Sequence, residues 1–421
     1  EISGWKDQRR ADAGKCLTLE EVKMNKLSRV DYPIKELPSG DKLFISSFKL
    51  ESGHAGPHVH IQASVHGAEL QGNAVIFHLM QYFIHHPFKG SVTFIPLANP
   101  AATNTKIGAY TYGRFNPVTG HNWNRCYEDV MVRSQEQIGG LLKAWCESHR
   151  NTAWEQIKRE YKSFILQSLV HFEAHLGRRG ENENKKLFLL LQMMAAPADI
   201  VLDLHIGPAS SRYIYSALYQ KKSVVDFHFP FVLNIPNEFA QAMDEASFMP
   251  WVHLQREFKA QWRDIPLEFQ AYTLELGSEE RLHFDEGKRD AEHILHYLAR
   301  QGMIEKGQES ASFERPLQRH LLLKDYRTLY APSGGLVHYH KAPGEFVKKG
   351  EILASFLNFK RIHDESTFEQ ALETMPAHED CFIINHCSSA SVSKGIELFQ
   401  VAENVEELSP SLSLSLSNSR G

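Results

Sequence analysis

Two histidines and two glutamates stand at the ends of three apolar runs in this chain. His66 and Glu69 close the first run, His205 closes the second and Glu275 closes the third. Catalytic zinc is typically held by three protein ligands, and a position is left for water. A His and a Glu three residues apart can both face one ion where a strand rolls into a loop, and Gly67 suits that tight geometry. The pattern therefore indicates a metal site at strand ends.

Each of these residues also has an ordinary interpretation. A His-x-x-Glu occurs by chance in many chains, and a single buried His is common in protein cores. His205 favours the metal interpretation, because Asp203 lies two residues earlier on the same strand face. A carboxylate that fixes a ligand His is a common supporting group. We therefore expect Asp203 to support His205.

Glu275 lies in Thr-Leu-Glu-Leu-Gly, where a strand delivers an acid to a glycine turn. A metal-activated water needs a base that takes its proton and returns it to the leaving nitrogen. Glutamate serves because burial raises its pKa toward neutrality. We predict that Glu275 is this general base and acid, whereas in isolation it would be read as an exposed strand-end residue.

A loop between the candidate ligands carries two guanidiniums, Arg114 and Arg125, within residues 113–125. Arginine pairs with carboxylates through two parallel hydrogen bonds and stabilises developing negative charge. The loop therefore indicates recognition of an acidic substrate, although arginine in a loop is only moderately specific.

The elements that would position these residues follow from hydrophobic periodicity. Short apolar runs at 57–65 and 91–97 predict buried strands, and the helical spacing between them at 70–84 predicts a strand–helix–strand unit of a mainly parallel sheet. The other predictions are helices from 131 to 194 interrupted by a surface loop at 180–186, strands at 200–205, 212–217 and 271–276, and a helix at 290–301.

The sequence pattern changes after residue 315, where short apolar runs alternate with glycine turns and predict an all-β module. The predicted fold class is α/β, with a mixed, mainly parallel sheet flanked by helices and a small all-β C-terminal domain. The predicted domains are a catalytic domain with a helical insertion, a β-rich domain and a low-complexity tail, at 1–314 (insertion around 131–196), 315–408 and 409–421.

Length and composition limit the number of domains, the kinds of partner and the location that can be expected. The chain has 421 residues, which favours two domains, and a net charge of -5 with no long basic block. These features give no indication of nucleic-acid or membrane binding. The five cysteines are odd in number and lack a Cys-x-x-Cys, which argues against a disulfide framework and favours a cytoplasmic location. A homo-oligomer is compatible with the sequence.

Taken together, the motifs resemble those of the succinylglutamate desuccinylase/aspartoacylase family, within the zinc carboxypeptidase-like superfamily. The order and spacing agree over roughly residues 55–300, and the joint match is specific although each piece is not. The residues that carry the resemblance are His66-Gly-x-Glu69, Asn99-Pro100, Arg114, Asn124-Arg125, Asp203-Leu-His205 and Glu275-x-Gly277.

The resemblance implies one Zn²⁺ ion held by His66, Glu69 and His205, and a zinc-activated water that hydrolyses an amide. It also implies that Glu275 acts as base and acid, that Arg114 polarises the carbonyl, and that Asn124 and Arg125 bind the substrate carboxylate. The C-terminal module is similar to the small β domain of these enzymes.

Two features depart from the family pattern. The family usually has Asp two residues before the Asn of Asn-Arg, where it supports the first His, and this chain has Asn122. An amide oxygen still accepts that hydrogen bond but lacks charge, so we expect lower ligand basicity and metal affinity. The segment 126–198 is also long for the family, and inserted helices there would reshape the substrate entrance.

The predicted function is hydrolysis of an N-acyl amino acid, or of a related small amide that bears a free carboxylate. The nearest alternative is a metallocarboxypeptidase that acts on peptides. A non-catalytic binding protein of the same fold is a weaker alternative, because all three ligands and Glu275 are present. Zinc is favoured by the resemblance, although other first-row metals accept the same ligands.

Overall fold

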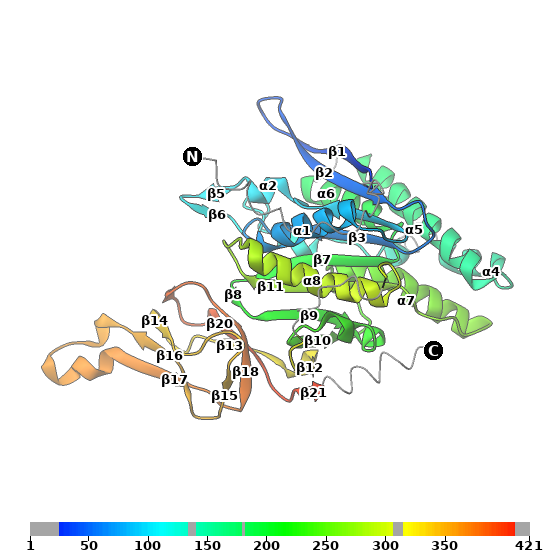
Figure 1. Cartoon of the computed structure of the whole chain (residues 1–421). Coiled ribbons are helices and arrows are strands. Elements are labelled where there is room, and N and C mark those ends of the chain that lie inside the picture. The colour runs from blue at the N-terminus through cyan, green and yellow to red at the C-terminus, as the bar shows by residue number, and fades with distance from the viewer. Residues whose placement is uncertain (1–24, 134–139, 179–181, 306–314, 409–421) are drawn as a thin grey trace, which may run out of the picture.

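The computed structural model describes residues 25–133, 140–178, 182–305 and 315–408. Within these residues the chain forms one large sheet between two helical layers, and a smaller β domain that projects from one end (Figure 1). The order of the ten strands is β1-β2-β4-β3-β7-β11-β9-β10-β12-β21. The middle of this sheet, β4-β3-β7-β11, is parallel, and β9, β10 and β12 run the opposite way. The predicted mixed, mainly parallel α/β fold is therefore confirmed.

The strands of the large sheet are short to medium in length. Their bounds are β1 (Leu27–Glu36), β2 (Lys42–Glu51), β3 (His58–Ala63), β4 (Ser91–Ile95), β7 (Ile200–Gly207), β9 (Arg212–Ala217), β10 (Phe231–Ile235), β11 (Gln270–Ser278), β12 (Gln318–Leu322) and β21 (Glu406–Leu408).

Two helical layers cover the sheet. One layer consists of α1 (Gln71–His85) and α8 (Phe284–Arg300), and the other of α4 (Leu141–Ser148), α5 (Trp154–Gly177), α6 (Glu183–Ala195) and α7 (Met243–Gln261). The chain leaves β4 through the short helix α2 (Pro100–Thr103) and a two-stranded ribbon of β5 (Lys106–Ile107) and β6 (Tyr110–Thr111). The 3₁₀ turns are η1 (Trp123–Arg125), η2 (Leu218–Gln220), η3 (Val224–Phe227), η4 (Leu323–Asp325), η5 (Phe359–Arg361) and η6 (Glu365–Ala371).

Most sequence predictions of these elements are confirmed to within a few residues. The predicted loop at 180–186 is wrong in part, because α6 begins at Glu183. Asn182 caps this helix by accepting a hydrogen bond from the amide of Asn184, which lets the helix start inside a polar run. The closing helix α8 also begins earlier than predicted, at Phe284, with Asp285 and Glu286 in its first turn.

The C-terminal region forms two smaller sheets, ordered β13-β20-β18-β15 and β17-β16-β14-β19, around their own apolar core. Their strands are β13 (Tyr326–Tyr330), β14 (Gly335–Tyr339), β15 (Phe346–Val347), β16 (Ile352–Leu357), β17 (Leu372–Pro376), β18 (Cys381–His386), β19 (Ser391–Val392) and β20 (Glu397–Ala402). The predicted all-β module is confirmed. Two segments of the range 315–408, β12 and β21, belong to the large sheet instead, and the predicted tail at 409–421 lies outside the described residues.

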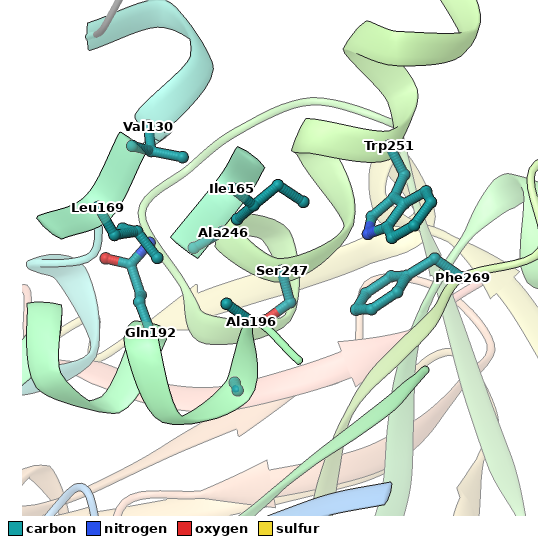
Figure 2. A pocket seen from close by; sticks show the side chains of 10 residues that line it. Val130, Ile165, Leu169, Gln192, Ala196, Ala246, Ser247, Trp251 and Phe269 are labelled. Atoms are coloured by element: carbon teal, nitrogen blue, oxygen red, sulfur yellow. The ribbon is translucent and has the colours of Figure 1, made fainter. Parts of the chain in front are cut away.

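Figure 2 shows a small pocket between α5, α6 and α7. Its lining is mainly apolar, and the rings of Trp251 and Phe269 stack beside it with centroids 5.5 Å apart. The polar Gln192 in the lining already bonds to the backbone of Glu128. None of the predicted site residues lines this pocket, so it reflects packing of the helical layer. Within the described residues, no helix has the length and apolar character that a membrane span requires.

Candidate active site

The four central residues come together because the ends of three parallel strands meet at one edge of the sheet. β11 pairs with β7 in parallel and places Glu275 beside His205. β3 pairs with β7 on its other side, and the chain leaves β3 through a tight turn to His66. Gly67 is required in this turn, since a Cβ there would lie 2.5 Å from the carbonyl oxygen of Ala102.

His66, Glu69 and His205 form a compact buried cluster, and their potential ligand atoms all lie within 4.8 Å of one another. Glu69 is at the centre. Its Oε1 lies 2.6 Å from Nδ1 of His66, and its Oε2 lies 2.7 Å from Nδ1 of His205. All three side chains are almost completely shielded from solvent.

The groups on the far side of each ring determine where the imidazole protons lie. Nε2 of His205 is 2.8 Å from Oδ2 of Asp203, and Nε2 of His66 is 2.9 Å from Oδ1 of Asn122. Both oxygens accept hydrogen bonds, so in the neutral form of each imidazole the single proton lies on Nε2. Each Nδ1 then presents a lone pair to Glu69. Three acceptors that face one another fit a divalent cation as their common partner.

The electrostatics agree with this interpretation. Burial opposes protonation of His205, yet the carboxylates of Asp203 and Glu69 outweigh it and raise the pKa of His205 well above its usual value. Burial likewise opposes ionisation of Glu69, but the two imidazoles hold the pKa of its carboxyl below the usual range. The space between these groups therefore attracts positive charge.

The structure places Asp203 and Asn122 where the sequence predicts them, each behind one histidine. Asp203 is itself fixed by Gln62, which donates to its Oδ1 at 3.0 Å, and Gln62 also contacts the hydroxyl of Tyr127 at 3.3 Å. Gln62 and Tyr127 were not predicted. Gln62 could have been found, because it is a polar residue inside an apolar strand and shares a strand face with the site.

Glu275 is 8% exposed, and its Oε2 has no hydrogen-bond partner among the described residues. Burial, together with the neighbouring Glu69 carboxylate, raises the pKa of Glu275 to about 7. A general acid–base group works best with a pKa near the operating pH. The geometry thus gives Glu275 a free oxygen and a pKa suited to proton transfer.

Arg114, Asn124 and Arg125 lie beside the cluster on the loop 113–125. Nη2 of Arg114 is 3.8 Å from Oε1 of Glu69, and 42% of the Arg114 side chain remains exposed. Asn124 is buried, with Nδ2 3.4 Å from Nε2 of His205 and its Oδ1 without a described partner. Arg125 is exposed, and its Nη1 donates to the carbonyl of Asn124 at 2.6 Å. The exposed guanidinium of Arg114 therefore borders the buried cluster, and that of Arg125 lies against the backbone of the neighbouring Asn124.

Sequence reasoning missed a tyrosine group next to Glu275. Tyr213 is paired with Glu275 across the antiparallel β9–β11 ladder, and its ring centroid lies 5.4 Å from that of Tyr215 and 6.4 Å from that of Tyr326. Burial, and then the charge of Glu275, raise the pKa of Tyr213. Tyr326 comes from the C-terminal domain, so only the tertiary structure could bring it here.

The C-terminal domain is attached directly behind a candidate ligand. The segment after β7 forms the short strand β8 (Ala209–Ser210), which pairs with β18 of the C-terminal domain. The amide of Ser211 also donates to the carbonyl of Ile384 at 2.9 Å. The C-terminal domain therefore helps to fix the chain four residues beyond His205.

Comparison with known proteins identifies the family of the chain. Residues 55–300 match the family model described as the succinylglutamate desuccinylase/aspartoacylase catalytic domain. No curated protein matches the chain. A solved structure assigned to this family from Shewanella frigidimarina NCIMB 400 is 37% identical, with a TM-score of 0.83, and the match covers 92% of this chain and 100% of that chain. The small unmatched remainder is shorter than the segment 126–198, so that structure shares at least part of the helical segment.

A second family member, from Shewanella amazonensis SB2B, is 36% identical with a TM-score of 0.82, and the match covers 90% of this chain and 100% of that chain. A more distant structure, the ectoine utilization protein EutE (DoeB) from Ruegeria pomeroyi, shares the fold at 14% identity, with a TM-score of 0.61 and coverage of 90% and 96%. The family is typically metal-dependent and indicates a deacylase or amidohydrolase type of function. The family model and the Shewanella structures show that this chain belongs to the succinylglutamate desuccinylase/aspartoacylase family.

Proposed function

We propose that this protein is a zinc-dependent hydrolase that cleaves the amide bond of an N-acyl amino acid or of a related small amide with a free carboxylate. The observation that carries the proposal is the buried His66–Glu69–His205 cluster, with Oε2 of Glu275, which has no partner among the described residues, beside it. A divalent ion held by the cluster would polarise a carbonyl and lower the pKa of a water molecule.

The residues around the cluster supply the rest of the reaction. Glu275 accepts a proton from the attacking water as the carbon–oxygen bond forms. It then gives that proton to the amide nitrogen as the carbon–nitrogen bond breaks, so that a carboxylic acid, which ionises in water, and a primary amine leave. The guanidinium of Arg114 donates to the carbonyl oxygen, where negative charge develops. A pKa of about 7 lets Glu275 act in both directions near neutral pH.

Arg125 supports a substrate with a carboxylate close to the scissile bond. Arg125 adjoins Asn124, whose side-chain nitrogen Nδ2 is 3.4 Å from Nε2 of His205, and a carboxylate bound by Arg125 would then lie near the cluster. Such a position would suit the α-carboxylate of an amino acid whose nitrogen is acylated. Bidentate pairing to arginine then fixes the orientation of the substrate.

The test is the release of primary amine from a panel of N-acyl amino acids and short peptides by zinc-loaded protein. We expect release from one or a few acyl amino acids. Each active substrate is compared with its carboxamide analogue, in which the carboxylate is replaced, and we expect a much higher KM for the analogue. Release confined to the C-termini of peptides would establish the carboxypeptidase alternative. No release from any amide, with zinc bound, would contradict the proposal.

A further inference from the structure

The loop 113–125, called the clamp loop below, is held from outside by the helical layer. Asn184, near the start of α6, is 2% exposed and makes two hydrogen bonds to this loop. Its Oδ1 accepts from Nδ2 of Asn116 at 2.6 Å, and its Nδ2 donates to Oγ1 of Thr119 at 3.1 Å. Both the oxygen and the nitrogen of the buried Asn184 side chain thus bind one turn of the clamp loop.

Asn116 is the centre of that turn. Its Oδ1 accepts from the amides of Val118, at 2.8 Å, and Thr119, at 3.3 Å. Its backbone amide donates to the carbonyl of His121 at 2.8 Å, and its carbonyl accepts from the amide of Gly120 at 2.8 Å. Asn116, to which Asn184 of α6 is hydrogen-bonded, therefore organises the tip of the clamp loop.

The two arms of the clamp loop carry the residues of the site. The amide of Trp123 donates to the carbonyl of Arg114 at 3.0 Å, and Phe115 forms an isolated bridge with Asn122. Arg114 on one arm reaches Glu69, and Asn122 on the other arm reaches His66. A shift of the tip would therefore be transmitted to both contacts through this paired segment.

We propose that Asn184 is a positioning residue, through which α6 holds Arg114, Asn122 and Arg125 in register with the His66–Glu69–His205 cluster. The inference rests on the proposed function for its kinetic consequences only. Surface loops are mobile unless side chains tie them down. A misplacement of about 1 Å can lower a rate roughly 100-fold. The helical segment then acts on the site as well as covering the sheet.

A purely structural role for Asn184 makes a different prediction. Any buried, hydrogen-bonded side chain in the helical layer contributes to stability, and its loss would loosen the layer generally. Tyr161 provides the matched case, since its hydroxyl donates to the carbonyl of Pro250 at 2.8 Å and joins α5 to α7, and within the described residues it has no hydrogen bond to the clamp loop.

The experiment compares Asn184→Ala with Tyr161→Phe in the full-length, zinc-loaded protein. Hydrogen–deuterium exchange is measured over residues 113–125, together with the melting temperature, kcat and KM. We expect faster exchange in the clamp loop only for Asn184→Ala, and a fall in kcat/KM of roughly 10- to 100-fold. Tyr161→Phe should lower the melting temperature but leave the clamp loop and kcat/KM unchanged.

Thr119→Val removes one of the same contacts from the loop side and covers the case in which Asn184→Ala does not fold. It should reproduce the local increase in exchange. Unchanged exchange over 113–125 in both variants, or equal losses of kcat/KM in Tyr161→Phe, would overturn the inference. Exchange needs no substrate, so the positioning role is decided even if the proposed hydrolysis fails.

Discussion

On the side of the large sheet that carries α1 and α8, the side chains of β7 are Leu202, Leu204 and Ile206, all fully buried in an apolar core. On the opposite side the same strand presents Asp203 and His205. β11 repeats this division, with Leu274 and Leu276 on one side and Glu275 on the other. Successive strand residues point to opposite faces, so each strand contributes to both environments.

The difference shows how stability and chemistry are separated within single strands. The apolar face buries surface, which is the main favourable contribution to folding. The polar face buries Val201 and Ala271 in a second apolar core, and toward the strand ends it buries charged and polar groups, which is unfavourable unless they are paired. Its polar members are paired in a chain that runs from Gln62 through Asp203 and His205 to Glu69. Oε2 of Glu275 is one of the exceptions among the described residues, with Oδ1 of Asn124 and Oγ1 of Thr273, and it lies where the proposed chemistry requires a free oxygen.

The largest effect is expected from Glu275→Gln on the polar face. Glutamine has a similar shape but cannot accept the proton, so kcat should fall roughly 100- to 10,000-fold. Zinc content, measured by metal analysis, should stay the same because Glu275 lies outside the ligand cluster. Glu275→Asp, which keeps a carboxylate, should retain more turnover. Activity of Glu275→Gln close to that of the unaltered protein would remove this residue from the proton-transfer role.

The next largest effect is expected from Arg125→Ala. Loss of a guanidinium that pairs with the substrate carboxylate should raise KM roughly 10- to 100-fold, with a smaller change in kcat. Carboxamide analogues serve as the control, since they should respond little to the same change. An unchanged KM for carboxylate substrates would show that Arg125 does not bind this group.

A pair of variants compares the two faces directly. Leu298→Ala on α8 opens a cavity in the apolar core and should lower the free energy of unfolding by about 2–5 kcal/mol with kcat/KM nearly unchanged. Gln62→Leu on the polar face removes the hydrogen bond to Asp203, and should lower kcat/KM or metal affinity about tenfold. Urea unfolding and steady-state kinetics measure both. If both variants changed stability and activity in the same ratio, the separation of the faces would be wrong.

The smallest effect is expected from Asn122→Asp. A carboxylate in place of the amide should make His66 a more basic ligand and tighten metal binding by less than tenfold. Competition with a chelator measures this change. Weaker retention of zinc in the variant would contradict the link between the basicity of His66 and metal binding, because Asp keeps an oxygen that accepts from the backbone amide of Asn124.

Much of the fold could be predicted from the sequence, because alternation and helical spacing are local properties of the chain. The apolar runs indicated β3, β4, β7 and β11, and glycine turns indicated the β module after residue 315. The start of α6 was misplaced, since its polar first turn resembles a loop until the Asn182 cap is seen. That β12 and β21 belong to the large sheet could not be predicted, because their pairing joins segments far apart in sequence and leaves no pattern in the local sequence.

The candidate site divides in the same way. The sequence by itself determined which residue types could hold a metal or move a proton, because His66, Glu69, His205 and Glu275 each stand at the end of an apolar run. Only the tertiary structure decided which nitrogen of each histidine faces Glu69, that Gln62 fixes Asp203, and that Asn184 on α6 grips the clamp loop. The physical reason is range, because a strand end is encoded by its neighbours in sequence. Apart from the contact of His66 with Glu69, these contacts join residues 68 to 141 positions apart, so packing alone sets their distance and direction.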